Sequence, residues 1–130
     1  MVPSSGQVYG IIGSATLATQ ALDNQVVSNH VIRIAPKREP SIRVGYLVTA
    51  LSHLKWGRPL VKSLAFGSSV PEIDPADLAR FKIVRLSRET ESAIADLAEG
   101  SANARAEADI LEREIAKDAA KIIDRFIRDV

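Results

Sequence analysis

The fold is decided by residues 88–130, RETESAIADLAEGSANARAEADILEREIAKDAAKIIDRFIRDV, which contain no proline and a single glycine, Gly100. Apolar side chains recur along this stretch at Ala108, Leu111, Ile115, Ala119, Ile122 and Phe126, a mean spacing of 3.6 residues. Because 3.6 residues make one turn of α-helix, the spacing predicts a long, straight amphipathic helix from Ser87 onward. Such an exposed helix needs a partner, and we expect protein contacts at Leu111, Ile115, Ile122 and Phe126.

Shorter helices are expected upstream of the long one. Apolar residues spaced by four and three predict a helix after Ser41, a suitable N-cap, at Val44, Val48, Leu51 and Leu54. Gly57 is expected to end this helix, and Pro59 suits the first position of a short second helix. Asp74, followed by a proline and then Asp77, predicts a third helix that runs to about Arg80.

The first third of the chain has the composition of short strands and turns. Residues 7–35 are rich in Val, Ile and Thr and are interrupted by glycines and by an Asp-Asn pair. The clearest strand is predicted at 30–35, followed by a loop at 36–40, and a further strand is predicted at 82–86. The expected fold is therefore α+β, a small mixed or antiparallel sheet with short helices, followed by the long C-terminal helix.

Length and composition bound the class of protein. A chain of 130 residues with 46% hydrophobic and 25% charged residues is typical of one globular domain. It has no cysteine, which excludes disulfides and thiolate metal sites and fits a reducing compartment. No apolar run is long enough to span a bilayer, and residues 1–10 lack the layout of a secretory signal. We expect a soluble, cytoplasmic protein without membrane contact.

The net charge of +1 hides two halves of opposite sign. Residues 1–88 hold 11 Lys and Arg against 5 Asp and Glu, a net charge of +6, whereas residues 89–130 hold 6 against 11, a net charge of −5. This asymmetry suggests a basic part that faces a polyanion and an acidic part that faces something else. A basic surface that is merely solvated remains an equal alternative on charge alone.

The sequence gives little support for catalysis or for a bound cofactor. Gly6, Gly10 and Gly13 are spaced by four and three, which does not match the dinucleotide-binding fingerprint, and no phosphate-binding loop is present. His30 and His53 lie 23 positions apart, without cysteine or a His-Glu-x-x-His motif, and neither stands beside a nucleophile motif. We therefore expect no catalytic residues, no metal and no cofactor.

Four segments in order resemble the target recognition domains of the specificity subunits of type I restriction-modification systems. They are PSSGQVYG at 3–10, VSNHVIRI at 27–34, GYL at 45–47 with Leu51 and Trp56-Gly57, and FGSSVPEI at 66–73 with residues 78–86. They are similar to that family's Ser-Gly turn and strand, its Ser-x-His strand, its Tyr-Leu helix, and its glycine-containing loop with short helix and strand. The resemblance covers nearly the whole chain.

The resemblance implies sequence-specific binding of double-stranded DNA, with no enzymatic activity in this chain. Residues 1–86 would form a partial DNA target recognition domain, and residues 87–130 a spacer helix that docks a methyltransferase subunit, with a restriction subunit as a further partner. In such domains cations and hydroxyls hold phosphates while a few polar side chains contact bases. The residues expected to contact DNA are Ser4, Ser5, Gln7, Tyr9, Lys62, Ser68 and Ser69.

Two departures from the family pattern keep alternatives open. The family domain has further sheet before the Ser-Gly turn, and after Leu86 it has a proline and a glutamine where this chain has SRETE at 87–91. One alternative is a truncated remnant that dimerises through the long helix and no longer binds DNA. A second is a small enzyme, which a deep pocket lined by His30 or His53 with a nearby acid would favour.

Overall fold

A computed structural model describes residues 1–7, 9–38, 41–67 and 69–129. The elements in chain order are β1 (Val2–Pro3), the 3-10 helix η1 (Gln20–Leu22), β2 (Val31–Ile32), α1 (Val44–Ser52), α2 (Arg58–Lys62), α3 (Pro75–Arg80) and α4 (Arg88–Arg128). The two strands pair antiparallel, with Val2 opposite Ile32 and Pro3 opposite Val31. The fold is thus mixed α and β, as expected from the sequence. It is mostly helical, and its sheet is smaller than expected.

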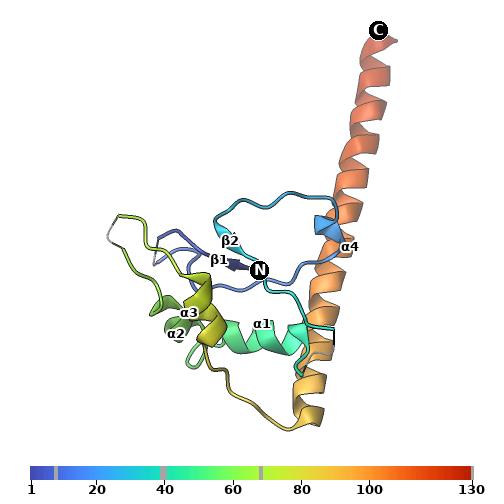
Figure 1. The fold of residues 1–130 in the computed structure, drawn as a ribbon. Coiled ribbons are helices and arrows are strands. Elements are labelled where there is room, and N and C mark those ends of the chain that lie inside the picture. Colours follow the sequence, from blue (N-terminus) through green and yellow to red (C-terminus); the bar gives the residue numbers. More distant parts are fainter. Residues whose placement is uncertain (8, 39–40, 68, 130) are drawn as a thin grey trace.

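The long helix is present as predicted. Ser87 precedes α4, and its hydroxyl accepts a hydrogen bond from the Thr90 N–H at 3.2 Å, which satisfies one of the free donors at the helix start. The N-terminal half of α4 packs against α1 and η1, and its C-terminal half extends beyond the body of the protein (Figure 1). No helix within the described ranges combines the length and apolar character needed to cross a membrane.

The capping aspartate of α3 is confirmed, whereas the expected cap and stop of α1 are wrong. Asp74 accepts a hydrogen bond from the Ala76 N–H at 2.7 Å. Helix α1 begins at Val44, two residues later than a Ser41 cap requires, and it ends at Ser52, well before Gly57. The acceptor for the Gly45 N–H is Glu99 of α4, at 3.0 Å. A side chain 54 positions away therefore replaces the local cap that the sequence suggested.

Most of the predicted β structure is absent from the described residues. The strand expected at 30–35 is reduced to β2, the segment at 82–86 forms no strand, and the described part of residues 7–29 consists of turns, coil and η1. Strands need ladder partners from elsewhere in the chain, and the described residues supply only β1 as a partner for β2. The predictions rested on local composition, which does not report whether a partner exists.

The core lies between the small sheet and the short helices. Its buried residues are Val2, Ile12, Leu51, Val61, Ile73 and Leu78. Half-buried apolar side chains from α1, from the continuation of β2 and from the segment after α3 surround this cluster. Gly57 follows α1 at a point where a Cβ atom would collide with the Ala50 carbonyl oxygen, so the chain can turn into α2 only with glycine there. The core thereby fixes α2 beside residues 9–14.

Candidate interaction surfaces

Residues 9–14 lie against α2. The Arg58 Nη2 donates a hydrogen bond to the Gly10 carbonyl oxygen at 3.1 Å. A Cβ atom on Gly13, whose φ is +79°, would lie 2.6 Å from Lys62 Cγ and 2.9 Å from the Arg58 carbonyl oxygen. The backbone of this turn therefore approaches α2 as closely as glycine allows, and it places the first predicted DNA-contact segment beside Lys62.

The same turn also meets the loop before α3. The Gly6 N–H bonds the Pro71 carbonyl oxygen at 3.3 Å, and Ser5 and Phe66 each form an antiparallel bridge with Glu72. Three segments from separate parts of the chain thus gather on the side of the body away from α4 (Figure 1). The sequence named residues in each of these segments without predicting that they would come together.

The predicted DNA-contact residues differ in accessibility. Tyr9 is 99% exposed, and Gln7 and Ser69 are also exposed, whereas Lys62 is half-buried. Ser4 is half-buried, with its backbone bonded to His30 and Ile73. Ser5 is buried, and its hydroxyl is 2.7 Å from His30 Nδ1. Ser68 lies outside the described residues. Ser5 therefore holds the small sheet together from within and does not face solvent.

Three side chains at or just before α2, those of Lys55, Trp56 and Arg58, enlarge this surface and were not among the residues expected to contact DNA. Lys55 is exposed, with its Nζ 4.8 Å from the centroid of the Trp56 ring, which is itself 54% exposed. Arg58 and Lys62 lie four residues apart on α2 and Lys55 lies in the turn before it, so the density of cations in residues 55–62 is the signal from which they could have been found. We call the following set the distal surface: Gln7, Tyr9, Lys55, Trp56, Arg58, Lys62 and Ser69.

The two histidines have structural partners. His53 Nδ1 accepts hydrogen bonds from the N–H groups of Lys55 and Trp56, at 3.2 and 3.1 Å, and so stabilises the turn after α1. His30 lines an open hollow of about 520 Å³ together with Glu72, but the buried Ser5 that bonds His30 is not part of that lining. A serine nucleophile must be reachable by its substrate. The Ser5–His30 pair is thus better explained as a bond that joins the chain after β1 to the residue before β2.

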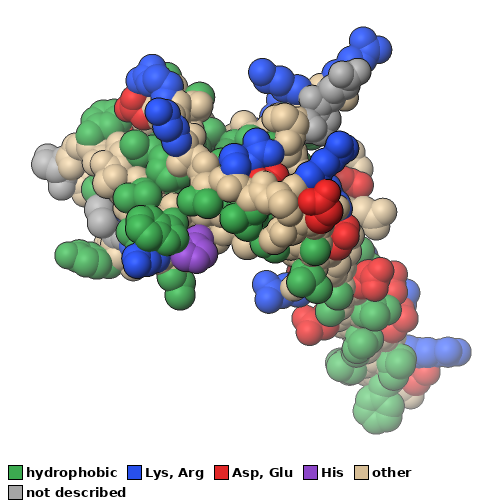
Figure 2. Space-filling model, turned by 90° about the horizontal axis from the view of Figure 1, so that it is seen from below, with side chains coloured by type: hydrophobic (Ala, Val, Ile, Leu, Met, Phe, Trp, Pro, Cys, Tyr) green, Lys and Arg blue, Asp and Glu red, His purple; other side chains and the backbone are tan. Residues whose placement is uncertain are grey.

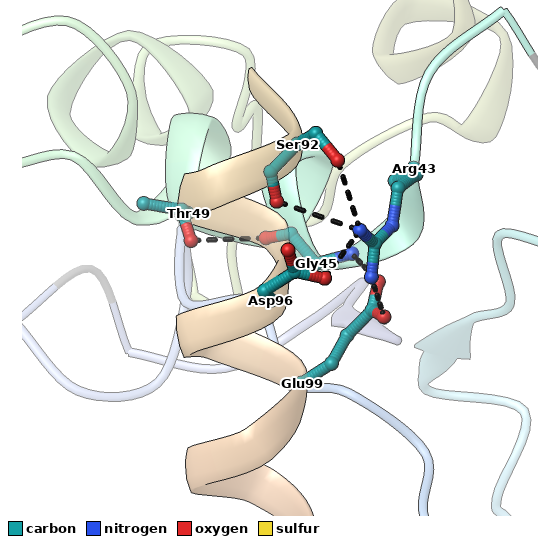
Figure 3. A network of polar contacts seen from close by, with 6 residues as sticks. All are labelled: Arg43, Gly45, Thr49, Ser92, Asp96 and Glu99. Carbon is teal, nitrogen blue, oxygen red and sulfur yellow. Dashed lines mark hydrogen bonds and ion pairs between the residues drawn. The ribbon is translucent and has the colours of Figure 1, made fainter. Parts of the chain in front are cut away.

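A network around Arg43 fixes α1 to α4 (Figure 3). The guanidinium donates to Asp96 and Glu99 at 2.5 Å each and to the Ser92 hydroxyl at 3.2 Å. The hydrogen bond to Asp96, followed by the one to Glu99, raises the pKa of Arg43 above its ordinary value. At Gly45 a Cβ atom would lie 2.6 Å from the Ala95 carbonyl oxygen, so the two helices approach to backbone distance there.

A further ion pair, between Arg85 and Glu91, holds the start of α4. Arg85 Nε and Nη2 donate to the two carboxylate oxygens of Glu91 at 2.7 and 2.8 Å, and the Leu86 N–H donates to Oε1 at 2.9 Å. Glu91 is only 7% exposed. The bonds from Arg85, followed by the Leu86 N–H, hold the pKa of Glu91 below its ordinary value. This bidentate pair keeps the first turn of α4 in place.

The projecting part of α4 presents an apolar face to solvent. Ile115, Ile122 and Phe126 are 68, 70 and 71% exposed, and Leu111 is 58% exposed. Figure 2 shows hydrophobic side chains gathered on this end of the helix beside charges of both signs. All four residues expected to bind a protein partner are therefore accessible in the single chain.

The apolar face begins earlier than the sequence pattern indicated. Leu97 is 76% exposed although it belongs to the half of α4 that packs on the body. It lies nine residues, or two and a half turns, from the buried Ala106, and so on the opposite side of the helix. The face of α4 that is turned away from the body thus carries an apolar stripe along most of its length.

Comparison with known proteins adds no relative: no family description, no curated protein and no solved structure matches this chain.

Proposed function

We propose that the chain is a cytoplasmic DNA-recognition module that contacts a duplex with the distal surface and joins partner proteins through α4. The observation that carries this proposal is the meeting of three separate segments, with their cations and exposed polar side chains, on the side away from α4. The residues expected to contact DNA from the resemblance to target recognition domains lie in these three segments. The geometry supports it because contacts from several loops are needed to cover one binding site.

Three types of side chain in the distal surface are proposed to contact DNA. Lys55 and Lys62 suit contacts with phosphates, which provide affinity without sequence information, while Arg58 holds the turn at Gly10 and its Nε is buried. Tyr9 carries an exposed hydroxyl that can donate to a phosphate, and the amide of Gln7 can pair with the edge of an adenine. Ser5 is excluded from this proposal because its hydroxyl is bonded to His30.

In this proposal methyl transfer and cleavage belong to partner subunits. Residues 89–130 carry a net charge of −5, so phosphates repel α4, and its apolar face suits a methyltransferase or restriction subunit better than DNA. The module would then position those subunits on the target sequence, and the chain itself would contain no catalytic residue.

A salt titration of duplex binding tests the proposal. The double variant Lys55→Gln/Lys62→Gln removes two cations from the distal surface, whereas Arg113→Gln/Lys117→Gln removes two from α4. Each lost phosphate contact lowers the slope of log K against log salt by about one, so we expect a slope smaller by about two for the first variant alone. Fluorescence anisotropy of a labelled pool of duplexes measures both slopes.

Two results would count against DNA binding. One is the absence of measurable binding by the unmodified chain at about 50 mM salt, where phosphate contacts are strongest. The other is an equal decrease in the slope of log K against log salt in both double variants. That outcome would mean that DNA contacts are not concentrated on the distal surface.

A second candidate function is a structural one, in which two copies dimerise through α4 without any affinity for DNA. The observation that favours it is the regularity of the apolar stripe. Starting from Leu97, the intervals of three, four and four residues repeat along the stripe at Leu97, Gly100, Ala104, Ala108, Leu111, Ile115, Ala119, Ile122 and Phe126. A repeat of 11 residues keeps one face in register over a nearly straight or slightly right-handed helix pair.

The charges beside the stripe favour an antiparallel pair. From Ala108 onward, the charged residues that immediately precede stripe positions change sign along the helix, in the order Glu107, Glu114, Asp118, Lys121 and Arg125. If Ile115 faces the partner's Ile122, Glu114 lies opposite the partner's Arg125 and Asp118 opposite the partner's Lys121. Each exposed pair contributes about 0.2–1 kcal/mol, which is enough to select one orientation and register among pairs that bury similar stripes.

A parallel pair has no such complementarity. In a parallel pair, the residue that precedes one stripe position lies beside the residue that follows the next stripe position on the partner helix. Glu107, which precedes Ala108, therefore lies beside the partner's Glu112, which follows Leu111. Asp118 then meets the partner's Ile123, and no ion pair forms between the helices in this register. Like charges oppose the parallel form while opposite charges support the antiparallel form.

Cross-linking distinguishes the two orientations because the chain contains no cysteine. We expect the variants Ile115→Cys and Ile122→Cys, mixed and oxidised, to form a disulfide with each other, since the antiparallel register brings these positions together. Neither variant alone should cross-link efficiently. Efficient self-cross-linking of Ile115→Cys alone would contradict the antiparallel register and support the parallel one. Mass spectrometry of tryptic digests measures each product.

A further inference from the structure

Two segments that the sequence predicts as strands border one apolar groove without completing a sheet. The groove has a volume of about 450 Å³, lies beside α1 and α3, and is open to solvent. One wall is β2 with its continuation to residue 35, and the other is the beginning of the segment after α3. The apolar residues that line it include Ile32, Ile34, Leu47, Leu51, Phe81 and Ile83. The two segments predicted as strands, residues 30–35 and 82–86, therefore both border this groove.

Both walls keep the side-chain alternation of strands. Ile32 and Ile34 are half-buried against the core with an exposed Arg33 between them, and Phe81 and Ile83 are half-buried with an exposed Lys82 between them. A period of two is the signature of extended backbone with one face on a core. The walls thus already have the side-chain arrangement of strands and lack only the ladder.

The backbone at both walls has free hydrogen-bonding groups. Among the described residues β2 pairs with β1 alone. In an antiparallel strand the backbone N–H and C=O groups of every second residue face one neighbouring strand, and those of the residues between face the opposite side. Because the Ser4 N–H bonds the His30 carbonyl, the N–H and C=O of Val31 and Arg33 point away from β1. In the described part of the chain no backbone hydrogen bond involves residues 33–35 or 82–83. An open edge of this kind pairs readily with an added strand.

We propose that this groove binds an extended segment of another polypeptide as a β-strand, with apolar side chains at alternate positions and acidic side chains between them. A strand fits better than a helix because it supplies donors and acceptors to the walls, whereas a helix satisfies its own backbone. The acidic preference follows from Arg33 and Lys82, which are exposed cations on the two walls. This site lies apart from the distal surface and from the apolar stripe of α4.

Peptide binding to the full chain tests the proposal. The probe is a fluorescent, end-blocked peptide of alternating Val and Glu. The comparison peptides carry Lys in place of Glu, or methyl groups on alternate backbone nitrogens. We expect saturable binding of the first peptide, with affinity at least about tenfold higher than for either comparison peptide, equivalent to about 1.4 kcal/mol. Equal binding of the Lys peptide or of the methylated peptide would overturn the proposed ligand chemistry.

A pair of substitutions on α3 locates the site. Ala79 is exposed and lines the groove, whereas Ala76 is exposed on the same helix and does not line it. We expect Ala79→Trp to obstruct the groove and weaken peptide binding at least about tenfold, while Ala76→Trp leaves the affinity unchanged. Circular dichroism of both variants checks that the fold is intact. Unaltered affinity in Ala79→Trp, or no saturable binding of the Val-Glu peptide to the unmodified chain, would refute the proposal.

Two further measurements identify the mode and the occupant. Protection of the Arg33 and Lys82 amides from hydrogen exchange on peptide binding is the expected result, because both walls gain ladder bonds. Protection confined to α4 would refute the site. If Ala79→Trp converts a dimer of the chain into a monomer, a second copy occupies the groove and the proposed foreign strand is wrong. An unchanged molecular mass in that variant supports the proposal.

Discussion

The double variant Ile115→Asp/Ile122→Asp is expected to be monomeric under conditions in which the unmodified chain self-associates through α4. Both isoleucines are about two-thirds exposed in the single chain, so their replacement removes little from the body of the protein. Burial of one such side chain contributes about 1.5–3 kcal/mol, and an antiparallel pair buries both from each copy. We therefore expect the dimer to weaken at least about a thousandfold, equivalent to about 4 kcal/mol. Sedimentation equilibrium measures the change.

The control for this prediction is Lys117→Asp/Ala120→Asp. Lys117 and Ala120 are exposed on the side of α4 away from the stripe, so they add carboxylates to the same turns without entering the contact. The control loses more helix propensity than Ile115→Asp/Ile122→Asp, because Lys and Ala are better helix formers than Ile, so weakened helix formation alone would affect the control more. A dimer that survives Ile115→Asp/Ile122→Asp, or that dissociates equally in the control, would show that the stripe does not hold the copies together.

The second large effect is on the free energy of unfolding, which we expect Gly45→Ala in α1 to lower and Gly100→Ala in α4 to raise. Gly45→Ala places a Cβ atom 2.6 Å from the Ala95 carbonyl and 2.8 Å from Glu99, which must force α1 away from α4. Overpacking of this kind costs about 1–3 kcal/mol, against which alanine gains about 1 kcal/mol from helix propensity. Since the opposing atom is backbone and cannot rotate aside, we expect a net loss of about 2 kcal/mol.

Gly100→Ala has no such clash, because nothing lies within 4 Å of its added Cβ atom. It should gain the full propensity difference of about 1 kcal/mol. Urea unfolding of the two variants, with the slope m compared to that of the unmodified chain, measures both free energies. Stabilisation by Gly45→Ala would mean that α1 and α4 do not approach at Gly45 as described.

The helices could be predicted from the sequence because the features that define them are local. The apolar spacing of α4, its freedom from proline, and the Asp74-Pro75 start of α3 all lie within the elements that they specify. Helix α1 shows the limit of this approach. Its cap comes from Glu99, and its first residues are fixed by the bonds of Arg43 to α4. Local sequence contains no information about an acceptor 54 residues away.

The strands could not be predicted reliably because they depend on distant partners. Residues 30–35 and 82–86 both have strand composition, but only Val31 and Ile32 find a partner, in β1. Strand β1 itself was missed, since two residues that include Pro3 show no periodicity. Composition thus indicates that a segment prefers an extended backbone, but the segment forms a strand only where another strand is available to pair with it.

The apolar stripe of α4 could be predicted from the sequence better than the distal surface could, because it does not depend on contacts between distant segments. The stripe on α4 follows from one segment, so Leu111 and Phe126 could be chosen correctly as exposed apolar residues from their spacing alone. The distal surface combines three segments, and its assembly depends on contacts such as Arg58 with Gly10. Ser5 was expected to face DNA, but a hydroxyl in a turn can equally bond inward, and His30 is its partner.

The central claim, that the distal surface lies on duplex DNA while α4 does not, is tested most directly by photo-cross-linking from single positions. A photoreactive phenylalanine analogue replaces either Tyr9 or Leu111, both of which are exposed, and the protein is irradiated with a radiolabelled duplex pool. Because phosphate contacts are strongest at low salt, the test is run at about 50 mM. We expect covalent DNA adducts from position 9 and none from position 111. Adducts from position 111 with none from position 9 would contradict the assignment of the DNA surface, and adducts from neither would contradict DNA binding by the distal surface.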